Sequence, residues 1–196
     1  MEVLVGLVGK DFVLAGGDTS VIRSITVLKT TETKARQLNK HNVLYYSGEA
    51  GDTVHFAEYI QKNSQLFHFT NNGQDLNTPQ MAAFVRRQLA ESLRSRNPFQ
   101  VNILIGGWSE EHGPKLYWQD YMASSASVPY AAQGYGSYYL TSLLDRYHTR
   151  DMDLDSAVEI MKKCLHELKT RFIVNLPRFN FQVIDAQGIR DIEISI

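Results

Sequence analysis

The side chains that could perform chemistry in this sequence are a few hydroxyls and one lysine. Thr19, Ser20 and Ser47 each carry a hydroxyl that a neighbouring base can convert into a nucleophile, and Lys34 is the candidate base. This set predicts one possible activity, a self-sufficient hydrolase with a hydroxyl nucleophile. In that case replacing Lys34 by alanine would abolish the reaction with hydroxyl-directed probes.

The histidines, the cysteine and the glycines show no pattern typical of a metal or cofactor site. No H-E-x-x-H pair occurs, and no histidine has cysteine partners at metal-binding spacing. Cys164 falls on the apolar stripe of a predicted helix, where a thiol behaves as a small hydrophobe. The Gly-rich sites match neither phosphate-binding loop motif, and no G-x-S-x-G elbow is present. We therefore expect no metal, no cofactor and no cysteine nucleophile. The six histidines, for which packing or surface roles are expected, are His41, His55, His68, His112, His148 and His166.

Two periodicities alternate along the chain and predict the elements that would position these side chains. Strands joined by hairpins dominate about the first fifty residues and return in the middle and at the end of the chain. Apolar residues at helical spacing predict one pair of helices from Asp52 or Thr53 and from Thr78, and a second pair after Gly136 and from Asp151 or Asp153. The predicted strands are Glu2 to Val8, Asp11 to Gly16, Val21 to Leu28, Asn42 to Ser47, Val101 to Ile105, Lys115 to Tyr121, Ser127 to Ala132, Phe179 to Ile184 and Ile189 to Ile194.

Antiparallel hairpins interrupted by two helix pairs favour an α+β fold over a parallel doubly wound sheet. Two antiparallel sheets packed face to face, with helices covering both outer faces, would bury every apolar face of this pattern. The 196 residues contain no repeat or linker, so we expect one domain, 1–196.

Composition restricts the partners. Twenty basic and 21 acidic side chains leave no basic footprint for nucleic acid, and no apolar run approaches the ~20 residues that cross a bilayer. A single cysteine cannot form an internal disulfide, which favours the reducing cytoplasm or nucleus. We expect protein partners, with no nucleic acid and no membrane.

A family resemblance adds to this interpretation. The segment Ser47 to Asp52, between a strand and a long helix, resembles the glycine-loop segment of proteasome β subunits. Val101 to Trp108, Lys115 to Asp120 and Gly134-Tyr135-Gly136 resemble the same family in order and spacing, so the likeness covers essentially the whole chain. Gly48 to Asn63 resembles one branch of that family in particular. The fold implied is the N-terminal nucleophile (Ntn) hydrolase sandwich, αββα, which agrees with the layers inferred above.

The resemblance also implies a catalytic set that is incomplete here. Active members use an N-terminal threonine, exposed by removal of a propeptide, whose hydroxyl attacks while its own amine acts as base. Here Met1 stands at that place with no propeptide ahead of it, and Glu2 should discourage removal of the methionine. The family's acidic residue is expected where Gly17 stands; Asp18 is displaced by one residue, which should point its side chain elsewhere.

Other positions implied by the resemblance are mixed. Lys34 resembles the family's pKa-lowering lysine and Gly48 its oxyanion-hole glycine. Both also have simpler explanations, a surface or paired lysine and a glycine that permits a tight strand-to-helix turn. Tyr135 replaces the family's serine, with local packing as its expected role, and the family's Arg-Asp followed by Ser-Gly-Gly is not found in Arg171 to Phe179.

The resemblance therefore implies a non-catalytic structural β subunit of the 20S proteasome core particle. Its expected partners are other α and β subunits and assembly chaperones, and its expected role is to support the ring and the degradation chamber for ATP- and ubiquitin-dependent protein breakdown. Tyr138, Tyr139 and Tyr147 are candidate interface residues, because aromatic side chains are enriched at interfaces. Two other functions stay open, the hydrolase described above and a free-standing scaffold or chaperone-like binder outside any ring.

Overall fold

The computed structural model describes residues 2–24 and 26–194. Twelve strands and four helices occur in this part of the chain. The strands are β1 (Val3–Val8), β2 (Val13–Asp18), β3 (Val21–Arg23), β4 (Thr26–Lys29), β5 (Ala35–Asn39), β6 (Asn42–Gly48), β7 (Val101–Ser109), β8 (Gly113–Gln119), β9 (Ser125–Ser127), β10 (Tyr130–Gly134), β11 (Phe179–Asp185) and β12 (Gly188–Ile192). The helices are α1 (Asp52–Thr70), α2 (Thr78–Leu93), α3 (Ser137–Tyr147) and α4 (Leu154–Arg171).

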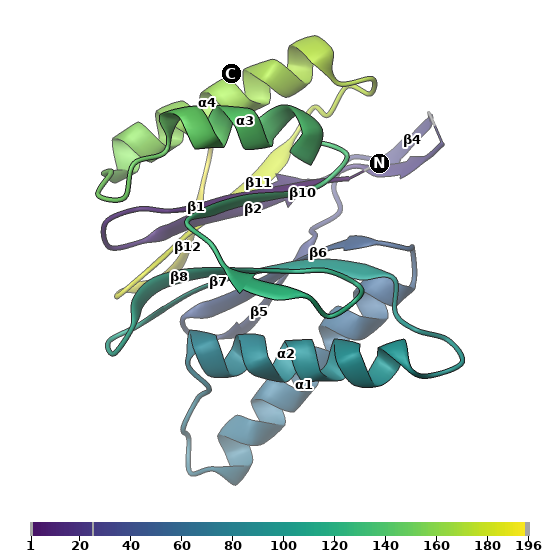
Figure 1. Ribbon diagram of the computed structural model, residues 1–196, viewed down its shortest axis with the longest axis vertical. Helices are drawn as coiled ribbons and strands as arrows, with labels where there is room; N and C mark the ends of the chain where they lie inside the picture. The colour runs from purple at the N-terminus through teal and green to yellow at the C-terminus, as the bar shows by residue number, and fades with distance from the viewer. Residues whose placement is uncertain (1, 25, 195–196) are drawn as a thin grey trace.

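The molecule has four layers (Figure 1). One five-stranded antiparallel sheet has the order β10-β1-β2-β11-β12, and a second has the order β5-β6-β7-β8-β9. The two sheets face each other in the middle, α3 and α4 cover the outer face of the first, and α1 and α2 cover the outer face of the second (Figure 1). The predicted αββα arrangement is thus confirmed.

Each interface between layers has its own apolar core. Alternate residues of β1 point to opposite faces of the sheet, as strand geometry requires. Val3, Val5 and Leu7 therefore pack under α3 and α4, while Leu4 packs against the second sheet. The helices α1 and α2 pack on the other side of the second sheet around fully buried side chains such as Phe56. These cores fix the two sheets to each other and so fix the strand ends that form the site below.

Five sequence predictions need correction. The predicted strand Ser127 to Ala132 covers parts of two strands in different sheets, β9 and β10, and Pro129, which has no N–H for a strand ladder, lies between them. The predicted strand Val21 to Leu28 is a hairpin of two short strands, β3 and β4, with Ser24 in its turn at φ 57°. Its residues are exposed or only partly buried, so no core face specified one continuous strand. The strand β5 was missed because it combines polar and apolar residues. The cap of α1 is Gly51 rather than Asp52 or Thr53, and the cap of α2 is Asn77, in a capping box with Gln80, rather than Thr78.

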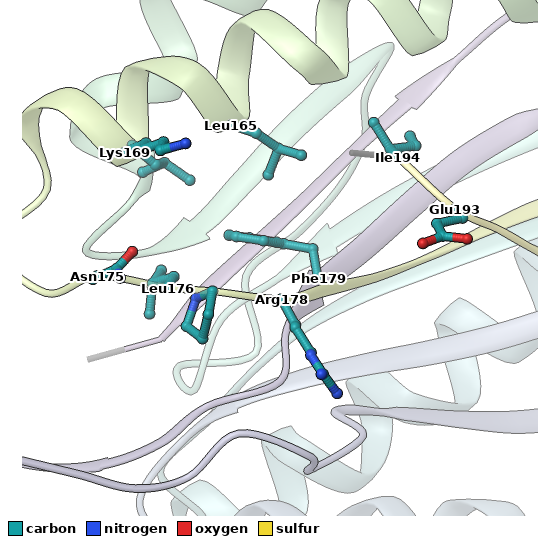
Figure 2. A pocket seen from close by; sticks show the side chains of 10 residues that line it. Leu165, Lys169, Asn175, Leu176, Arg178, Phe179, Glu193 and Ile194 are labelled. Atoms are coloured by element: carbon teal, nitrogen blue, oxygen red, sulfur yellow. The ribbon is translucent and has the colours of Figure 1, made fainter. Parts of the chain in front are cut away.

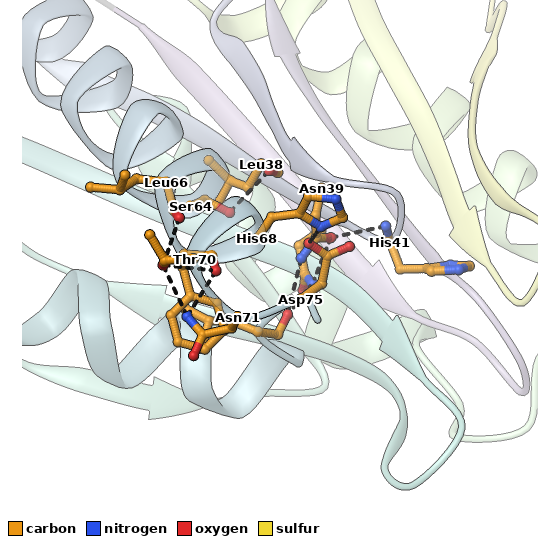
Figure 3. A network of polar contacts seen from close by, with 12 residues as sticks. Leu38, Asn39, His41, Ser64, Leu66, His68, Thr70, Asn71 and Asp75 are labelled. Carbon is orange, nitrogen blue, oxygen red and sulfur yellow. Dashed lines mark hydrogen bonds and ion pairs between the residues drawn. The ribbon is translucent and has the colours of Figure 1, made fainter. Parts of the chain in front are cut away.

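A polar network ties the C-terminal half of α1 to the β5–β6 hairpin (Figure 3). The Ser64 hydroxyl donates to the Leu38 carbonyl at 3.0 Å, and His68 Nδ1 lies 2.9 Å from an Asp75 carboxylate oxygen. The Asn39 amide donates to the Leu76 carbonyl at 3.0 Å. These bonds orient the second sheet against α1 without involving the strand ends at the opposite end of β6.

Candidate functional site

Lys34 and Asp18 form a buried ion pair at the end of β2. Lys34 immediately precedes β5, and its Nζ lies 2.8 and 2.9 Å from the two carboxylate oxygens of Asp18. Asp18 is fully buried and Lys34 is 5% exposed. The backbone of Lys34 is fixed as well, because its carbonyl accepts the Tyr46 N–H at 3.1 Å. Of the two simpler explanations for Lys34, a surface lysine or a paired lysine, the structure shows the paired one.

The Asp18 carboxylate has further donors. The Val3 N–H donates to Oδ1 at 2.8 Å and the Ser20 N–H donates to Oδ2 at 2.9 Å. Asp18 thereby holds the start of β1 against the end of β2, and its burial is compensated by hydrogen bonds and an opposite charge. The expectation that Gly17 leaves this place empty, and that Asp18 points elsewhere, is wrong. Position 17 instead faces Leu4, whose Cδ2 would lie 2.7 Å from a Cβ on Gly17.

Glu2 is the residue that reaches Lys34 and Gly48 together. The Gly48 N–H donates to Glu2 Oε2 at 2.7 Å, and Lys34 Nζ lies 3.5 Å from Glu2 Oε1. Sequence reasoning gave this place to Met1, which lies outside the described residues. At the end of β2 the acidic residue that pairs with Lys34 is Asp18 and not residue 17, so the resemblance was aligned one residue early there. The same offset, applied to β1, is the signal that could have identified Glu2.

Gly48 presents its N–H because of an unusual backbone conformation. It ends β6 at φ 142°, and a Cβ added there would lie 2.1 Å from the Gln100 carbonyl oxygen. A side chain is therefore excluded by both the backbone conformation and the lack of space. The predicted tight turn into α1 is present, and it aims the amide of Gly48 at the Glu2 carboxylate.

Gly134 and Gly136, on either side of Tyr135, lie in close contact with the beginning of β1. A Cβ on Gly134 would lie 2.1 Å from the Glu2 carbonyl oxygen, and one on Gly136 would lie 2.5 Å from a Val3 methyl. Tyr135 itself is 60% exposed, so the expectation that it packs locally is wrong for this chain. The contact with Glu2 and Val3 is therefore made by the two glycines and not by the tyrosine.

Comparison with known proteins decides the family. The model of the family described as "Proteasome subunit" matches residues 2–184. The "Probable proteasome subunit beta type-4" of Schizosaccharomyces pombe is 48% identical over 99% of this chain and 100% of its own length. The "Proteasome subunit beta type-2-A" of Arabidopsis thaliana is 42% identical over 97% of this chain and 93% of its own. This chain belongs to the proteasome β-subunit family. Relatives carry both type-4 and type-2 names, whereas Gly48 to Asn63 had suggested the type-2 branch alone.

The alternative nucleophiles of this proteasome subunit are not placed for attack. Ser20 and Ser47 are buried, and the Thr19 hydroxyl donates to the Thr30 carbonyl at 2.8 Å. Within the described residues the Lys34 ammonium has only carboxylates as polar partners, so none of the three hydroxyls contacts it. The structure therefore lacks the hydroxyl-base contact that the hydrolase hypothesis requires.

The Tyr46 phenol, close to the site, is not a base either. Burial raises the pKa of Tyr46 above its ordinary value; the Arg36 guanidinium lowers it, and carboxylates including Glu2 raise it further. The hydroxyl donates to the Thr33 carbonyl at 2.9 Å, so its proton is already engaged. Tyr46 stays protonated at neutral pH.

The second half of the segment Arg171 to Phe179, residues 175–179, lines a separate cavity of about 670 Å³ beside α4 (Figure 2). Lys169, Arg178 and Glu193 supply its charges, and Leu165, Leu176 and Phe179 are among its apolar lining residues. The end of the segment lies beside the site: Phe179 pairs with Asp18 across β11 and β2, and the Arg178 carbonyl accepts the Thr19 N–H at 3.1 Å. The cavity does not include Lys34 or Gly48.

The three tyrosines proposed as interface residues differ in exposure. Tyr138 is 84% exposed and Tyr147 is 39% exposed. Tyr139 instead packs against the core beneath α3, with its ring edge-to-face on Phe172 at 5.9 Å between centroids. Tyr138 and Tyr147 therefore stay candidates for contact with neighbouring subunits, and Tyr139 has a packing role.

The described residues contain neither a metal-binding cluster nor a membrane-spanning helix. Across 2–24 and 26–194, no three His, Cys, Asp or Glu side chains cluster in a way that could hold a metal ion. No helix within those ranges combines the length and the apolar character needed to cross a membrane.

Proposed function

We propose that this proteasome β subunit is non-catalytic and serves as a structural member of the 20S core particle. The observation that carries the proposal is the position of Glu2, whose carboxylate contacts both the Gly48 N–H and the Lys34 ammonium. With the resemblance shifted by one residue, as the position of Asp18 requires, the threonine of active members falls at residue 2. A carboxylate in that place supplies neither the hydroxyl nucleophile nor the contact between hydroxyl and base that covalent catalysis needs.

Processing of the N-terminus at either of the next two residues would not supply a threonine. Cleavage before residue 2 would expose a glutamate, and cleavage before residue 3 would expose Val3, whose N–H is already bound to Asp18. Tyr135 in place of the family's serine, and Arg171 to Phe179 without the family's Ser-Gly-Gly, support the same conclusion. Lys34 and Gly48 are then remnants of the family site that retain structural contacts.

The function of such a subunit is assembly. We propose that it contacts other α and β subunits within the stacked rings, at the position called β4, and that assembly chaperones handle it beforehand. It would wall the degradation chamber used in ATP- and ubiquitin-dependent protein breakdown, in the cytoplasm and nucleus. Tyr135, Tyr138 and Phe69 are large aromatic side chains that are exposed in the isolated chain. Their exposure supports the proposal that neighbouring subunits cover parts of its surface.

The test is to purify complexes through a C-terminal tag on this chain and to measure their native size, subunit composition and peptide hydrolysis. We expect a very large particle that contains other proteasome subunits and whose hydrolysis is blocked by a threonine-directed inhibitor. A small species that hydrolyses peptides by itself would support the hydrolase alternative. A stable, inactive monomer would support the free-standing scaffold. Either result would overturn the proposal.

A further inference from the structure

We propose that Lys34 and the Gly48 amide form a carboxylate-binding recess whose resident ligand is this chain's own Glu2, and that the recess accepts small free carboxylates once Glu2 is removed. The inference rests on the proposed function in one respect: only a non-catalytic subunit can have this recess permanently filled by its own side chain, since a catalytic subunit must leave it free for substrate.

The donors of the recess come from two strand ends. The Gly48 N–H donates to one Glu2 carboxylate oxygen at 2.7 Å, a length typical of a charge-assisted hydrogen bond. The other oxygen lies 3.5 Å from Lys34 Nζ, within ion-pair distance. Each carboxylate oxygen therefore faces a different donor, which is the arrangement of a site that binds a carboxylate group.

Lys34 is held in position independently of Glu2. Two hydrogen bonds to the fully buried Asp18 fix its ammonium, and an ammonium has three donor protons. Asp18 in turn accepts the N–H groups of Val3 and Ser20. Because these contacts do not involve Glu2, we expect Lys34 and Gly48 to keep their places when the Glu2 carboxylate is deleted.

The backbone of Glu2 is also fixed, which makes its side chain an efficient internal ligand. Its carbonyl oxygen lies against Gly134, and the next residue, Val3, is bonded to Asp18. A tethered and positioned carboxylate competes with free anions at a high effective concentration. Glu2 thus closes the recess to external carbonyl or carboxylate oxygens, including those of electrophilic inhibitors.

The group that the substitution Glu2→Ala removes determines which small molecule should be used as the probe. Glu2→Ala keeps Cβ and deletes one methylene and the carboxylate, a group with the shape and charge of acetate. Acetate should therefore restore the hydrogen bond to the Gly48 amide in Glu2→Ala. Acetamide, with nearly the same shape but no charge, should not.

The experiment is hydrogen exchange measured by mass spectrometry on assembled particles, following the Gly48 amide. Glu2→Ala should speed exchange of that amide roughly tenfold or more, since a charge-assisted hydrogen bond is lost. Molar acetate should slow it again in Glu2→Ala, relative to sodium chloride at the same ionic strength, and should leave the wild type unchanged. The matched control is Glu49→Ala, which deletes an exposed carboxylate one residue from Gly48 and should exchange like the wild type.

Unchanged exchange in Glu2→Ala, or an acetate effect equal in wild type and variant, would overturn the proposal. If Glu2→Ala does not assemble, Glu2→Asp serves instead: it keeps the charge but falls one methylene short of Gly48, so exchange must still accelerate. The result is separate from the proposed function. If the subunit reacts with a threonine-directed probe, the proposal that it is non-catalytic is refuted, whatever the exchange data show. Conversely, a non-catalytic subunit whose Gly48 amide exchanges equally fast in wild type and Glu2→Ala would refute only the carboxylate site.

Discussion

The ammonium of Lys34 lies within 2.9 Å of both carboxylate oxygens of Asp18, and the two side chains are almost completely shielded from solvent. This pair joins the end of β2 to the start of β5, and its carboxylate also binds the backbone at the start of β1. Three chain segments therefore depend on one ion pair.

Breaking this pair should destabilise the subunit strongly. Lys34→Met leaves the buried Asp18 charge uncompensated, which typically costs about 3–5 kcal/mol in the free energy of unfolding. The control is Lys29→Met, because Lys29 forms an exposed pair with Glu32 and such pairs contribute about 0–1 kcal/mol. Urea unfolding and the fraction of new subunit incorporated into particles both measure the difference. Equal effects of the two substitutions would contradict the structural role of the pair.

Gly134→Ala should displace the Glu2 backbone. A Cβ at this position lies 2.1 Å from the Glu2 carbonyl oxygen, at a backbone φ of 76°. Gly113→Ala is the matched control, because Gly113 has a φ of 64° and open space around it. The control should lose about 1–2 kcal/mol through backbone strain. Gly134→Ala should lose a further ~1–3 kcal/mol through overpacking, and comparable unfolding midpoints for the two variants would show that the Glu2 contact is not tight.

The N-cap of α4 predicts a pH dependence. The Ser156 N–H donates to the Asp153 carboxylate at 2.8 Å, and hydrogen bonds from Ser156 lower the pKa of Asp153 below its ordinary value. Because the folded-state pKa is lowered, the stabilisation is fully present above the unfolded pKa of about 3.9 and is lost as the pH falls through the folded pKa.

The stability difference between wild type and Asp153→Ala should accordingly stay constant from about pH 7 to pH 5 and shrink at lower pH. Asp155→Ala removes an equal charge from the same turn and serves as the control. Thermal unfolding over this pH range measures both. A difference that grows on acidification would have the wrong sign for a lowered pKa.

Cys164 should be inert in the folded subunit. Burial raises the pKa of its thiol to about 12, and the side chain, on the buried face of α4, is 1% exposed. Almost no reactive thiolate is therefore present at neutral pH. Iodoacetamide should leave the assembled particle's Cys164 unmodified over hours and modify it fully after denaturation. Stoichiometric alkylation of the native particle would show that this core opens readily.

The sequence was sufficient for the layers but not for the site. Alternation in β1 and helical spacing in α4 predicted the correct elements, because burial on one face leaves a clear period in the sequence. The hairpin β3–β4 left no such period, since neither of its faces is in a core. Polar contacts between residues far apart in the chain could not be predicted from the sequence pattern either. Nothing local in the sequence shows that Glu2 reaches Gly48, 46 residues away.

The partial success at the site has a simple cause. Lys34 and Gly48 were recognised because short neighbouring segments carry the resemblance. Asp18 was misplaced by one residue and Glu2 was missed, since a glycine-rich strand end, Gly16-Gly17, gives no side chain with which to fix the register. Only the tertiary contacts between β1, β2 and β6 establish that register.

Whether this subunit is catalytic can be read from the intact mass of the chain, isolated from particles saturated with a threonine-directed covalent inhibitor. A subunit with Glu2 at Lys34 and Gly48 should keep its unmodified mass while neighbouring subunits gain one inhibitor each and peptide hydrolysis stops. One inhibitor added to this chain would contradict the account and would identify the subunit as catalytic.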